Sequence, residues 1–349
     1  IPVAAVVLLQ VAVLAYAAMH SDLGFDAVFN FELKARVAFE NETRGEIPLA
    51  FFSDESRVWS HPRYPLLVPF AEFWIYAWLG RIDQQLVKIV FPLFYFALIC
   101  VVGGAVRRLA DTGTALLAVA ALGTLPPLTV IPGAISGYAE VPLASAIAAA
   151  TVCALAAVPD RRASGFWLAG ALAAVASWTK VEGAILALCL GAVVMIVAGR
   201  RAAPLVLLPF AVIVPWTIFQ QLWGIPEKDF PALSPLVALA NLDRVPVIAR
   251  VTARELITPG HWGLLWPSFA VIAAMALVQR RLRDVHVVMG VVVMVPLCIY
   301  AASYLLSSWT DVEGHIRTSF VRLLVPLAPV AMIFAAVQLK AMRAEMAGA

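Results

Sequence analysis

Long apolar stretches, separated by shorter polar ones, make up most of the chain. Ten of them approach the roughly 20 apolar residues that a helix needs to cross a bilayer; they lie at 1–19, 86–106, 114–132, 138–158, 165–178, 182–199, 203–223, 261–279, 285–305 and 320–339. Several contain proline, which a membrane bundle tolerates because neighbouring helices satisfy the freed backbone groups. The pattern predicts an all-α fold, a polytopic membrane helix bundle with about ten transmembrane helices.

The longest polar interruption lies at 20–85, and a second one lies at 224–260. Within the first, the apolar stretch 65–80 is only 16 residues long and carries Glu72. An acidic side chain is costly inside a bilayer, so we interpret 65–80 as a juxtamembrane helix rather than a span. The prediction is a single membrane domain over 1–349, which ends soon after its last span without a soluble C-terminal domain.

Basic residues indicate the orientation of this bundle. Such residues favour the cytoplasmic ends of spans, and five clusters occupy short turns or the C-terminal tail: Arg107-Arg108, Arg161-Arg162, Arg200-Arg201, Arg280-Arg281 with Arg283, and Lys340 with Arg343. All five fall on one side if 65–80 does not cross. The two long polar loops, with nearly all the acidic residues, then face outwards. We therefore expect an integral protein of the inner (cytoplasmic) membrane, in contact with its lipids, with an extracytoplasmic active face.

The segment 241–257 has two interpretations. Its apolar residues alternate with Arg244, Arg250 and Arg254 at helical spacing. This pattern suits a helix that lies in the interface with its arginines towards lipid phosphates. A solvated connector fits as well, and the sequence leaves both open.

Composition excludes other classes of protein. Of the 349 residues, 62% are hydrophobic and 13% are charged, and the mean hydropathy is +0.90; a soluble domain is about half apolar and a quarter charged. The net charge of +3 comes without a basic stripe interleaved with aromatic residues, so nucleic acid is not an expected partner. The four cysteines stand alone in apolar segments and indicate core packing rather than disulfides or a metal site.

Asp26 is the first candidate for chemistry. It follows the first span by a few residues, where Phe25 and Phe29 partly screen it, and this setting suits a general base. The alternative is an N-cap for the helix that follows, and Asp22 is the nearest rival. Lys34, in the same amphipathic segment, either contacts a phosphate or is solvated.

A second group stands between two prolines that block a regular helix, in Ser60-His61-Pro62-Arg63-Tyr64-Pro65. A rigid segment that carries His61, Arg63 and Tyr64 at the water–lipid boundary suits contacts with a phosphate or a sugar. An interfacial anchor, with Tyr64 in an aromatic belt, is the alternative.

Three further motifs bring charges to the ends of apolar stretches. Glu140, which follows Tyr138, begins a predicted span, where an acid needs a polar cavity or benefits from the helix N-terminus. Lys180 and Glu182 interrupt a long apolar run and either pair with each other or steady a phosphate.

The last motif contains Glu313, His315, Arg317 and Arg322, in the final outer loop and at the top of the last span. Arg322 at the headgroup level suits a phosphate or snorkels to lipid headgroups. The five histidines are dispersed, so the sequence requires no metal site. A divalent cation held by Asp26 and Glu140 is compatible with the sequence, and no other cofactor is implied.

The order of these motifs is more specific than any one of them. They are Leu33-Lys34-Ala35, His61-Pro62-x-Tyr64-Pro65, Gly137-Tyr138-Ala139-Glu140-x-Pro142, Trp178-Thr179-Lys180-x-Glu182-Gly183 and Arg322-Leu323-Leu324-x-Pro326. The series resembles bacterial integral membrane glycosyltransferases of the GT-C superfamily. It is similar to the branch that includes the aminoarabinose transferase of lipid A and the protein mannosyltransferases.

This resemblance implies a polyprenyl-phosphate sugar donor and an active site at the extracytoplasmic face. It also implies a catalytic acid in the first outer loop, which by position is Asp26. The second acid of the family would be Glu140, although this chain has Glu, one residue removed from Pro142, where relatives have Asp. Tyr138, Lys180, Glu182, His315 and Arg322 would join the substrate site.

We therefore expect a membrane glycosyltransferase that moves a sugar to a glycan, lipid or protein acceptor, with inversion and with Asp26 as base. One alternative is a lipid-linked sugar transporter or flippase. That function needs broken helices and a polar site at the bilayer midplane, whereas the charges here gather at one face. The other alternative is a non-catalytic membrane subunit related to the enzymes.

Overall fold

The computed structural model describes residues 2–41, 45–227, 230, 234–279 and 283–348, and within these ranges every regular element is a helix. The first half contains α1 Pro2–His20, η1 Ala27–Glu32, α2 Leu33–Glu40, α3 Leu49–Ser53, η2 Glu55–Ser60, α4 Leu67–Leu79, η3 Leu86–Ile89, α5 Val90–Leu109, α6 Thr112–Gly123, α7 Pro126–Thr129 and α8 Glu140–Ala157. The second half contains α9 Ala163–Thr179, α10 Val181–Ala198, η4 Gly199–Ala202, α11 Pro204–Leu222, α12 Pro235–Ala240, η5 Leu242–Arg244, α13 Val245–Leu256, α14 Pro259–Trp262, α15 Leu265–Val278, α16 Asp284–Ser303, η6 Tyr304–Leu306, α17 Val312–Leu324 and α18 Ala328–Gly348. The predicted all-α membrane fold is confirmed.

Six helical segments in the described ranges are long and apolar enough to cross a membrane: α1, α5 with η3, α8, α10 with η4, α11, and α16 with η6. The pair α17 and α18 makes a seventh if it counts as one span, with a bend of 55°. Pro326 lies at this bend, and a proline cannot continue the hydrogen bonding of the preceding helix. Residues 320–339 are therefore a broken helix rather than the single helix that their apolar pattern predicts.

The other three predicted spans form shorter apolar helices. The stretch 114–132 divides into α6 and α7 at Pro126, 165–178 becomes α9, and 261–279 divides into α14 and α15 at Gly263. At 1.5 Å per residue, the 12-residue α6 and the 14-residue α15 are shorter than a hydrocarbon core of about 30 Å. The prediction of ten crossings stays a prediction.

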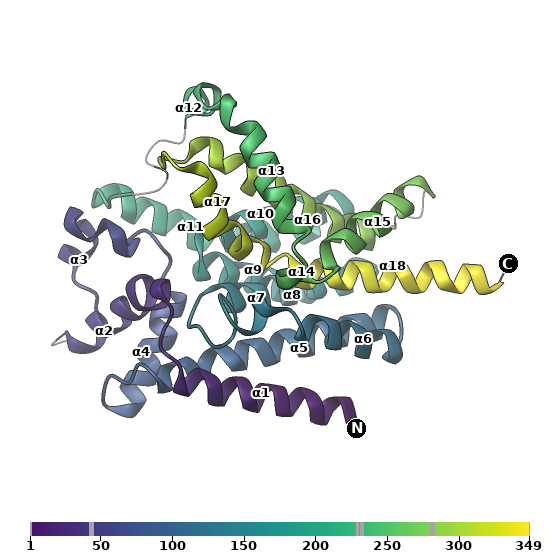
Figure 1. Cartoon of the computed structure of the whole chain (residues 1–349), viewed down its shortest axis with the longest axis horizontal. Coiled ribbons are helices and arrows are strands. Elements are labelled where there is room, and N and C mark those ends of the chain that lie inside the picture. The colour runs from purple at the N-terminus through teal and green to yellow at the C-terminus, as the bar shows by residue number, and fades with distance from the viewer. Residues whose placement is uncertain (1, 42–44, 228–229, 231–233, 280–282, 349) are drawn as a thin grey trace.

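The two termini lie at one end of the bundle, and α2, α3 and α4 lie at the other (Figure 1). We call residues 21–85, which build this second end, the cap. The Lys340 ammonium lies 2.9 Å from Asp111 Oδ2 and ties α18 to the turn between α5 and α6. Two of the predicted cytoplasmic clusters, Arg107-Arg108 and Lys340 with Arg343, are thus near each other, while Arg280 and Arg281 lie outside the described residues.

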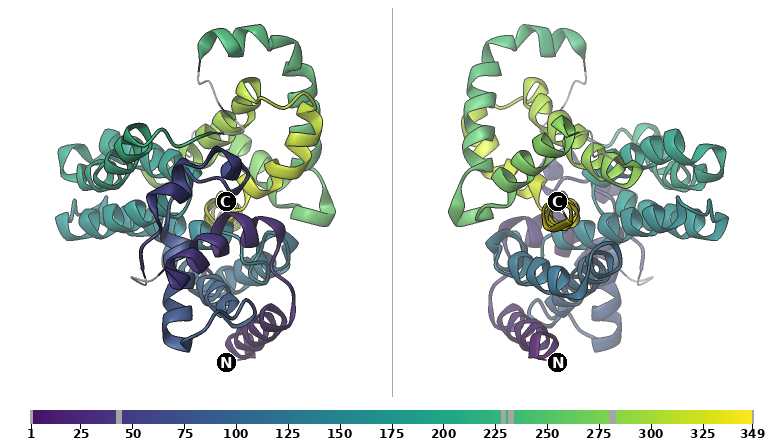
Figure 2. Two further views of the ribbon diagram at one scale, coloured as in Figure 1. Left: turned by 90° about the vertical axis from the view of Figure 1, so that its left-hand side faces the viewer. Right: turned by 90° about the vertical axis from the view of Figure 1, so that its right-hand side faces the viewer.

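Helix α8 forms the centre of the bundle and packs against α5 and α9. It is rich in alanine, and small side chains let membrane helices approach closely. Figure 2 shows the resulting layers, with α1, α5 and α6 on one side and α10 and α11 on the other. The N-terminus of α8 is thereby buried beneath the cap.

The second long loop folds as α12, η5, α13 and α14. Ile248 and Val251 of α13 are buried where α13 packs against α17, and Arg250 donates to Glu313 Oε2 at 2.8 Å. Protein therefore covers part of the apolar side of 241–257, and both interpretations of its arginines stay predictions.

Candidate active site

Six polar side chains from four separate segments converge where the cap meets the bundle. We call them the Arg322 cluster: Asp26 of the cap, Tyr138 and Glu140 at the start of α8, Lys180 and Glu182 at the junction of α9 and α10, and Arg322 in α17. All six are candidates from the sequence, and the structure brings them together.

Arg322 lies at the centre of the Arg322 cluster. Its Nη1 pairs with Asp26 Oδ2, and its Nε donates to Glu140 Oε1 at 2.7 Å. Its guanidinium carbon also lies 4.9 Å from the centroid of the Tyr138 ring. A planar guanidinium can hold two carboxylates and stack on a ring at once. Arg322 therefore fixes the positions of both candidate catalytic acids.

Lys180 bonds to the same acid from another side. Its ammonium lies 3.0 Å from Glu140 Oε1 and 3.0 Å from Glu182 Oε1. Lys180 is extended, with φ −158° and ψ 158°, so α9 ends and α10 begins around it. Glu140 Oε2 is buried and has no hydrogen-bond partner among the described residues. Glu140 is thus a buried carboxylate held by two cations.

Asp26 differs from Glu140 in exposure. The side chain of Asp26 is 19% exposed and that of Glu140 is 1% exposed. Asp26 precedes η1, but its side chain makes no cap hydrogen bond. The N-cap alternative therefore does not describe its geometry, and Asp26 is the carboxylate that a ligand can reach from outside the protein. Helix η1 is a single π-helical turn, a feature frequent at functional sites.

The approach of the cap to the start of α8 depends on Gly24. Its backbone N–H donates to Ser136 O at 3.0 Å, and a Cβ at this position would overlap the Tyr138 ring. The N–H of Asp26 reaches the Tyr138 hydroxyl at 3.4 Å. Tyr138 is therefore clamped between the backbone of the cap and the guanidinium of Arg322.

Gly137 permits the same contact from the other side. Its φ of +79° lies in the left-handed region, where glycine is unstrained. A Cβ on Gly137 would lie 2.7 Å from Leu23 Cδ2 and 3.0 Å from Ala27 Cβ. These two requirements give a physical reason for glycine at this point of the motif.

His61 and Tyr64 border the Arg322 cluster. Their rings stack with centroids 4.8 Å apart, and Tyr64 interacts electrostatically with Arg322. Arg63 points elsewhere: its Nε donates to Ile225 O at 2.7 Å, and its own carbonyl accepts from Trp216 Nε1 at 3.0 Å. Arg63 thus ties the cap to the end of α11.

Lys34 is fully buried within the cap. Its ammonium donates to the carbonyls of Asn30, Ser60 and His61, the last two at 2.9 Å and 3.2 Å. Burial disfavours the charged form and lowers the pKa of Lys34 to about 7, although the nearby Glu72 opposes this shift. This environment fits neither a solvated lysine nor a lysine that is available to contact a phosphate.

Glu72 of α4 is the acidic neighbour of Lys34. Its side chain is fully buried, and neither carboxyl oxygen has a hydrogen-bond partner among the described residues. Burial, and then the charge of Glu32, raise the pKa of Glu72 well above its usual range. Glu32 itself accepts from the Tyr76 hydroxyl at 2.8 Å. We call Glu32, Lys34, Glu72 and Tyr76 the Lys34 cluster.

His315 lies on α17, two turns before Arg322. Its Nδ1 shares a hydrogen bond of 2.7 Å with Ser307 Oγ, and its ring stacks on Trp309 with centroids 4.7 Å apart. It therefore steadies the loop between α16 and α17, and its place in a substrate site stays a prediction.

Two tyrosines that the sequence did not single out border the Arg322 cluster. The Tyr300 hydroxyl approaches Glu182 O at 3.5 Å, and the Tyr304 hydroxyl shares a hydrogen bond of 2.7 Å with Ser319 Oγ. Both are buried, Tyr300 in the last turn of α16 and Tyr304 at the start of η6. The sequence signal that could have identified them is a pair of tyrosines four positions apart within an apolar segment.

A divalent cation between Asp26 and Glu140 would have to take the position that the Arg322 guanidinium occupies. The Arg322 guanidinium already bridges the two carboxylates. Within the described ranges no three or more His, Cys, Asp or Glu side chains group as metal ligands. The donor set does not fit a cation unless Arg322 moves away, so we derive no chemical step through a metal.

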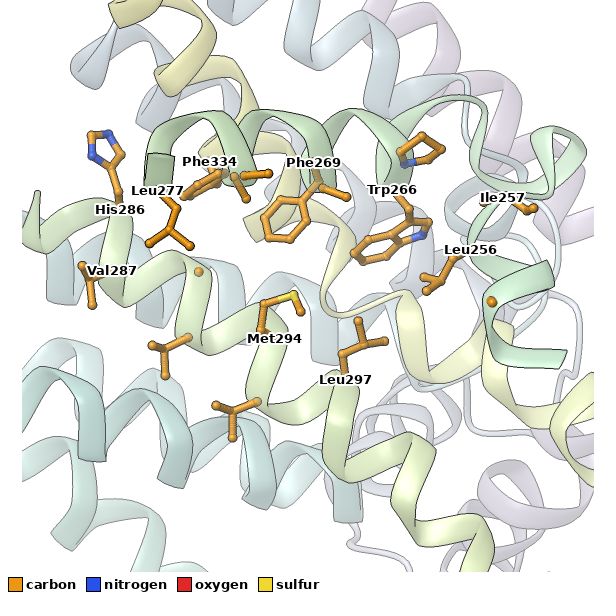
Figure 3. A pocket seen from close by; sticks show the side chains of 18 residues that line it. Leu256, Ile257, Trp266, Phe269, Leu277, His286, Val287, Met294, Leu297 and Phe334 are labelled. Carbon is orange, nitrogen blue, oxygen red and sulfur yellow. The ribbon is translucent and has the colours of Figure 1, made fainter. Parts of the chain in front are cut away.

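Two apolar cavities lie apart from these charges. One, of about 670 Å³, lies between α15, α16 and α18 (Figure 3), where Trp266, Phe269, Met294 and Phe334 line it. Another, of about 530 Å³, is lined by Leu67 and by residues of α9 and α11, including Trp178 and Trp216. The second cavity is adjacent to the candidate site, because Trp216 bonds to Arg63 and Trp178 is two residues before Lys180.

Comparison with known proteins identifies the fold but not the family. No family model matches the sequence. No curated protein matches it either. Among solved structures, the chain is similar to ArnT from Cupriavidus metallidurans in the apo state, with a TM-score of 0.61 and 18% sequence identity. The match covers 100% of this chain and 63% of ArnT, so the chain spans less than two thirds of that protein's length. At this identity the similarity shows the fold alone, an ArnT-like arrangement of helices.

Proposed function

We propose that this chain is an integral membrane glycosyltransferase that moves a sugar from a polyprenyl-phosphate donor to a glycan, lipid or protein acceptor. The observation that carries the proposal is the Arg322 cluster. A reachable carboxylate, a buried carboxylate and two cations meet at one end of a GT-C-like fold. The resemblance of the motifs to GT-C enzymes and the ArnT-like fold point in the same direction.

Asp26 is the base in this proposal. It removes the proton of an acceptor hydroxyl while that oxygen attacks the anomeric carbon of the donor sugar from the face opposite the phosphate. The bond between the anomeric carbon and the phosphate oxygen breaks, and the electron pair leaves with the polyprenyl phosphate, so the configuration inverts. Arg322 orients Asp26 through their ion pair; Glu140 holds Arg322 and Lys180 in place rather than touching the acceptor.

The leaving phosphate would be stabilised by the same cations. Arg322 has five N–H donors and Lys180 has three, and the contacts with Asp26, Glu140 and Glu182 do not use all of them. Donors fixed beside developing negative charge lower the barrier because they need not reorganise. Tyr64 and His61 would form one wall of this phosphate site.

The hydrocarbon chain of the donor would lie in the cavity between α9 and α11. Its walls are almost wholly apolar, and Trp178 connects it to Lys180. In this arrangement the cap faces the extracytoplasmic side of the inner membrane, because the basic clusters at the other end favour the cytoplasm.

Replacement of Asp26 tests the function. Asp26→Asn keeps the size and some hydrogen bonding of the side chain but removes its basicity. General base catalysis contributes about 10²- to 10⁴-fold, so we expect a loss of that size in sugar transfer. Mass spectrometry of envelope glycolipids and glycans, in a deletion strain complemented with each variant, would identify the missing product and measure the loss.

Asp22→Asn is the matched control, since Asp22 lies in the same loop but outside the Arg322 cluster, near Lys88. It should retain transfer. Full transfer by folded Asp26→Asn would refute the role of Asp26. If deletion instead removed a lipid-linked sugar from the outer leaflet without loss of a transfer step, the flippase alternative would replace the enzyme. An unchanged glycan profile with loss of a partner protein would favour the subunit.

A further inference from the structure

We propose that Lys34 is a positioning residue for the candidate active site: its buried ammonium holds the carbonyls of Ser60 and His61 and thereby fixes the Tyr64 ring beside Arg322. The inference depends on the proposed function in one respect: the donor phosphate would bind against the wall that His61 and Tyr64 form. It gives Lys34 a role different from the direct phosphate contact that the sequence predicts.

The donors of Lys34 are fully used within the cap. An ammonium has three N–H groups, and its three acceptors are the backbone carbonyls of Asn30, Ser60 and His61. The side chain is fully buried. A phosphate could bind Lys34 only if the ammonium left these carbonyls and the covering segment opened.

The backbone that Lys34 holds has an unusual conformation. His61 adopts φ 45° and ψ 64°, a left-handed conformation that is uncommon for residues with a side chain. Its carbonyl accepts from Lys34 and also from the N–H of Tyr64 at 3.0 Å. Hydrogen bonds to a charged donor are stronger than neutral ones. The ammonium thus stabilises the turn 61–64 in a conformation that the local sequence alone disfavours.

This turn also sets the position of the Tyr64 ring. The rings of His61 and Tyr64 stack at 4.8 Å, with an angle of 24° between their planes. Tyr64 also lies 6.2 Å from the ring of Phe31 and interacts electrostatically with Arg322. Direct contacts thus run from Lys34 to the His61 backbone and from the His61 ring to Tyr64, and the step from Tyr64 to Arg322 is electrostatic.

Chemical labelling of wild-type protein tests the burial of Lys34 without any variant. The full chain in lipid nanodiscs would be treated with acetic anhydride, with and without polyprenyl phosphate, and acetylation mapped by mass spectrometry. Lys340, whose side chain is 48% exposed, should be acetylated. Lys34 should stay unmodified in both samples. Acetylation of Lys34 in the folded protein would overturn the proposal, and its suppression by polyprenyl phosphate would restore the phosphate contact.

A double-mutant cycle tests whether Lys34 acts through Tyr64. Lys34→Met keeps much of the chain length but removes the donors. We expect it to weaken polyprenyl phosphate binding by on the order of tenfold in the wild type and to have no further effect with Tyr64→Leu. Additive losses would overturn the proposal, because a general effect on the fold would act in both backgrounds.

Hydrogen exchange separates this inference from the proposed function. The backbone amides of Ser60, His61, Arg63 and Tyr64 should exchange faster in Lys34→Met, while Lys340→Met should leave them unchanged. Equal exchange in Lys34→Met and wild type would overturn the positioning role. If the wild type does not bind polyprenyl phosphate, the proposed function fails, but labelling and exchange still decide the role of Lys34.

Discussion

The Arg322 cluster and the Lys34 cluster contain similar residues but differ in how their charges are satisfied. In the first, three carboxylates and two cations pair with one another, and Asp26 stays reachable. In the second, the lysine bonds to backbone carbonyls, and Glu72 has no hydrogen-bond partner among the described residues. The Arg322 cluster thus has ion-paired side chains, of which Asp26 is partly exposed, whereas the Lys34 cluster has a fully buried lysine bonded to backbone carbonyls beside a fully buried acid.

This difference indicates two roles. Cations that face carboxylates at a partly exposed position can rearrange towards a ligand at moderate cost. A lysine sealed among carbonyls cannot do so without local unfolding, because a buried charge is costly to leave unpaired. We therefore assign substrate chemistry to the Arg322 cluster and positioning to the Lys34 cluster.

Glu140→Gln should have the largest effect on stability. It leaves Arg322 and Lys180 without their shared buried acid, and breaking a buried ion pair in this way costs about 3–5 kcal/mol. Thermal unfolding in nanodiscs should therefore show a markedly lower transition temperature, together with loss of sugar transfer.

The matched control is Glu313→Gln, which also removes an acid shared by two cations. Arg250 and Arg317 pair with Glu313 at the surface, and exposed pairs contribute only about 0–1 kcal/mol. If Glu140→Gln were no more destabilising than Glu313→Gln, the Arg322 cluster would not be a tightly paired site.

The Arg322 cluster could be predicted in part from the sequence. Glu140, Lys180, Glu182 and Arg322 each interrupt an apolar pattern at the end of a predicted span, and a common face follows from the charge-based topology. The pairing of Arg322 with Asp26 could not be predicted. It joins residues nearly 300 positions apart, and no local pattern specifies which of several acids and cations at one face will meet.

The environment of Lys34 was not predictable either. Its amphipathic segment suggests a lysine on a solvated face, but the side chain is fully buried and bonds to the carbonyls of Ser60 and His61. The bend at Pro326 is a second feature that the apolar pattern did not predict. The apolar composition of 320–339 indicates a membrane helix, but the proline divides this stretch between α17 and α18.

Removal of Lys34 and removal of Glu72 should change the pH dependence of folding stability in opposite directions. The pKa of Lys34 is lowered in the folded state, so folded protein binds fewer protons than unfolded protein between about pH 7 and 10.5. Lys34 therefore adds stability as pH rises through this range. The raised pKa of Glu72 has the reverse effect: its stabilising contribution falls as pH rises above 4.5.

We expect Lys34→Met to lose about 2 kcal/mol relative to wild type between pH 7 and pH 9. Glu72→Gln should gain stability relative to wild type over the same interval. Denaturant or thermal unfolding of each variant at both pH values measures these differences. Parallel changes in the two variants would show that the residues do not titrate as an isolated buried pair.

The smallest expected difference is the one between Gly137→Ala and its control, and it tests how tightly the cap presses Tyr138 towards Arg322. An added Cβ is strained at φ +79° and would lie 2.7 Å from Leu23 Cδ2. Gly80→Ala is the control, since Gly80 has a similar φ of +66° but nothing within 4 Å of the added Cβ. Left-handed strain costs about 1–3 kcal/mol in either variant, so the extra loss in Gly137→Ala isolates the contact with the cap. We expect that extra loss to be about 1–2 kcal/mol, in the range for an overpacked site, with a fall in sugar transfer that Gly80→Ala does not show. Equal unfolding free energies and equal transfer in the two variants would mean that the cap adjusts freely, and that the geometry of the Arg322 cluster does not depend on this contact.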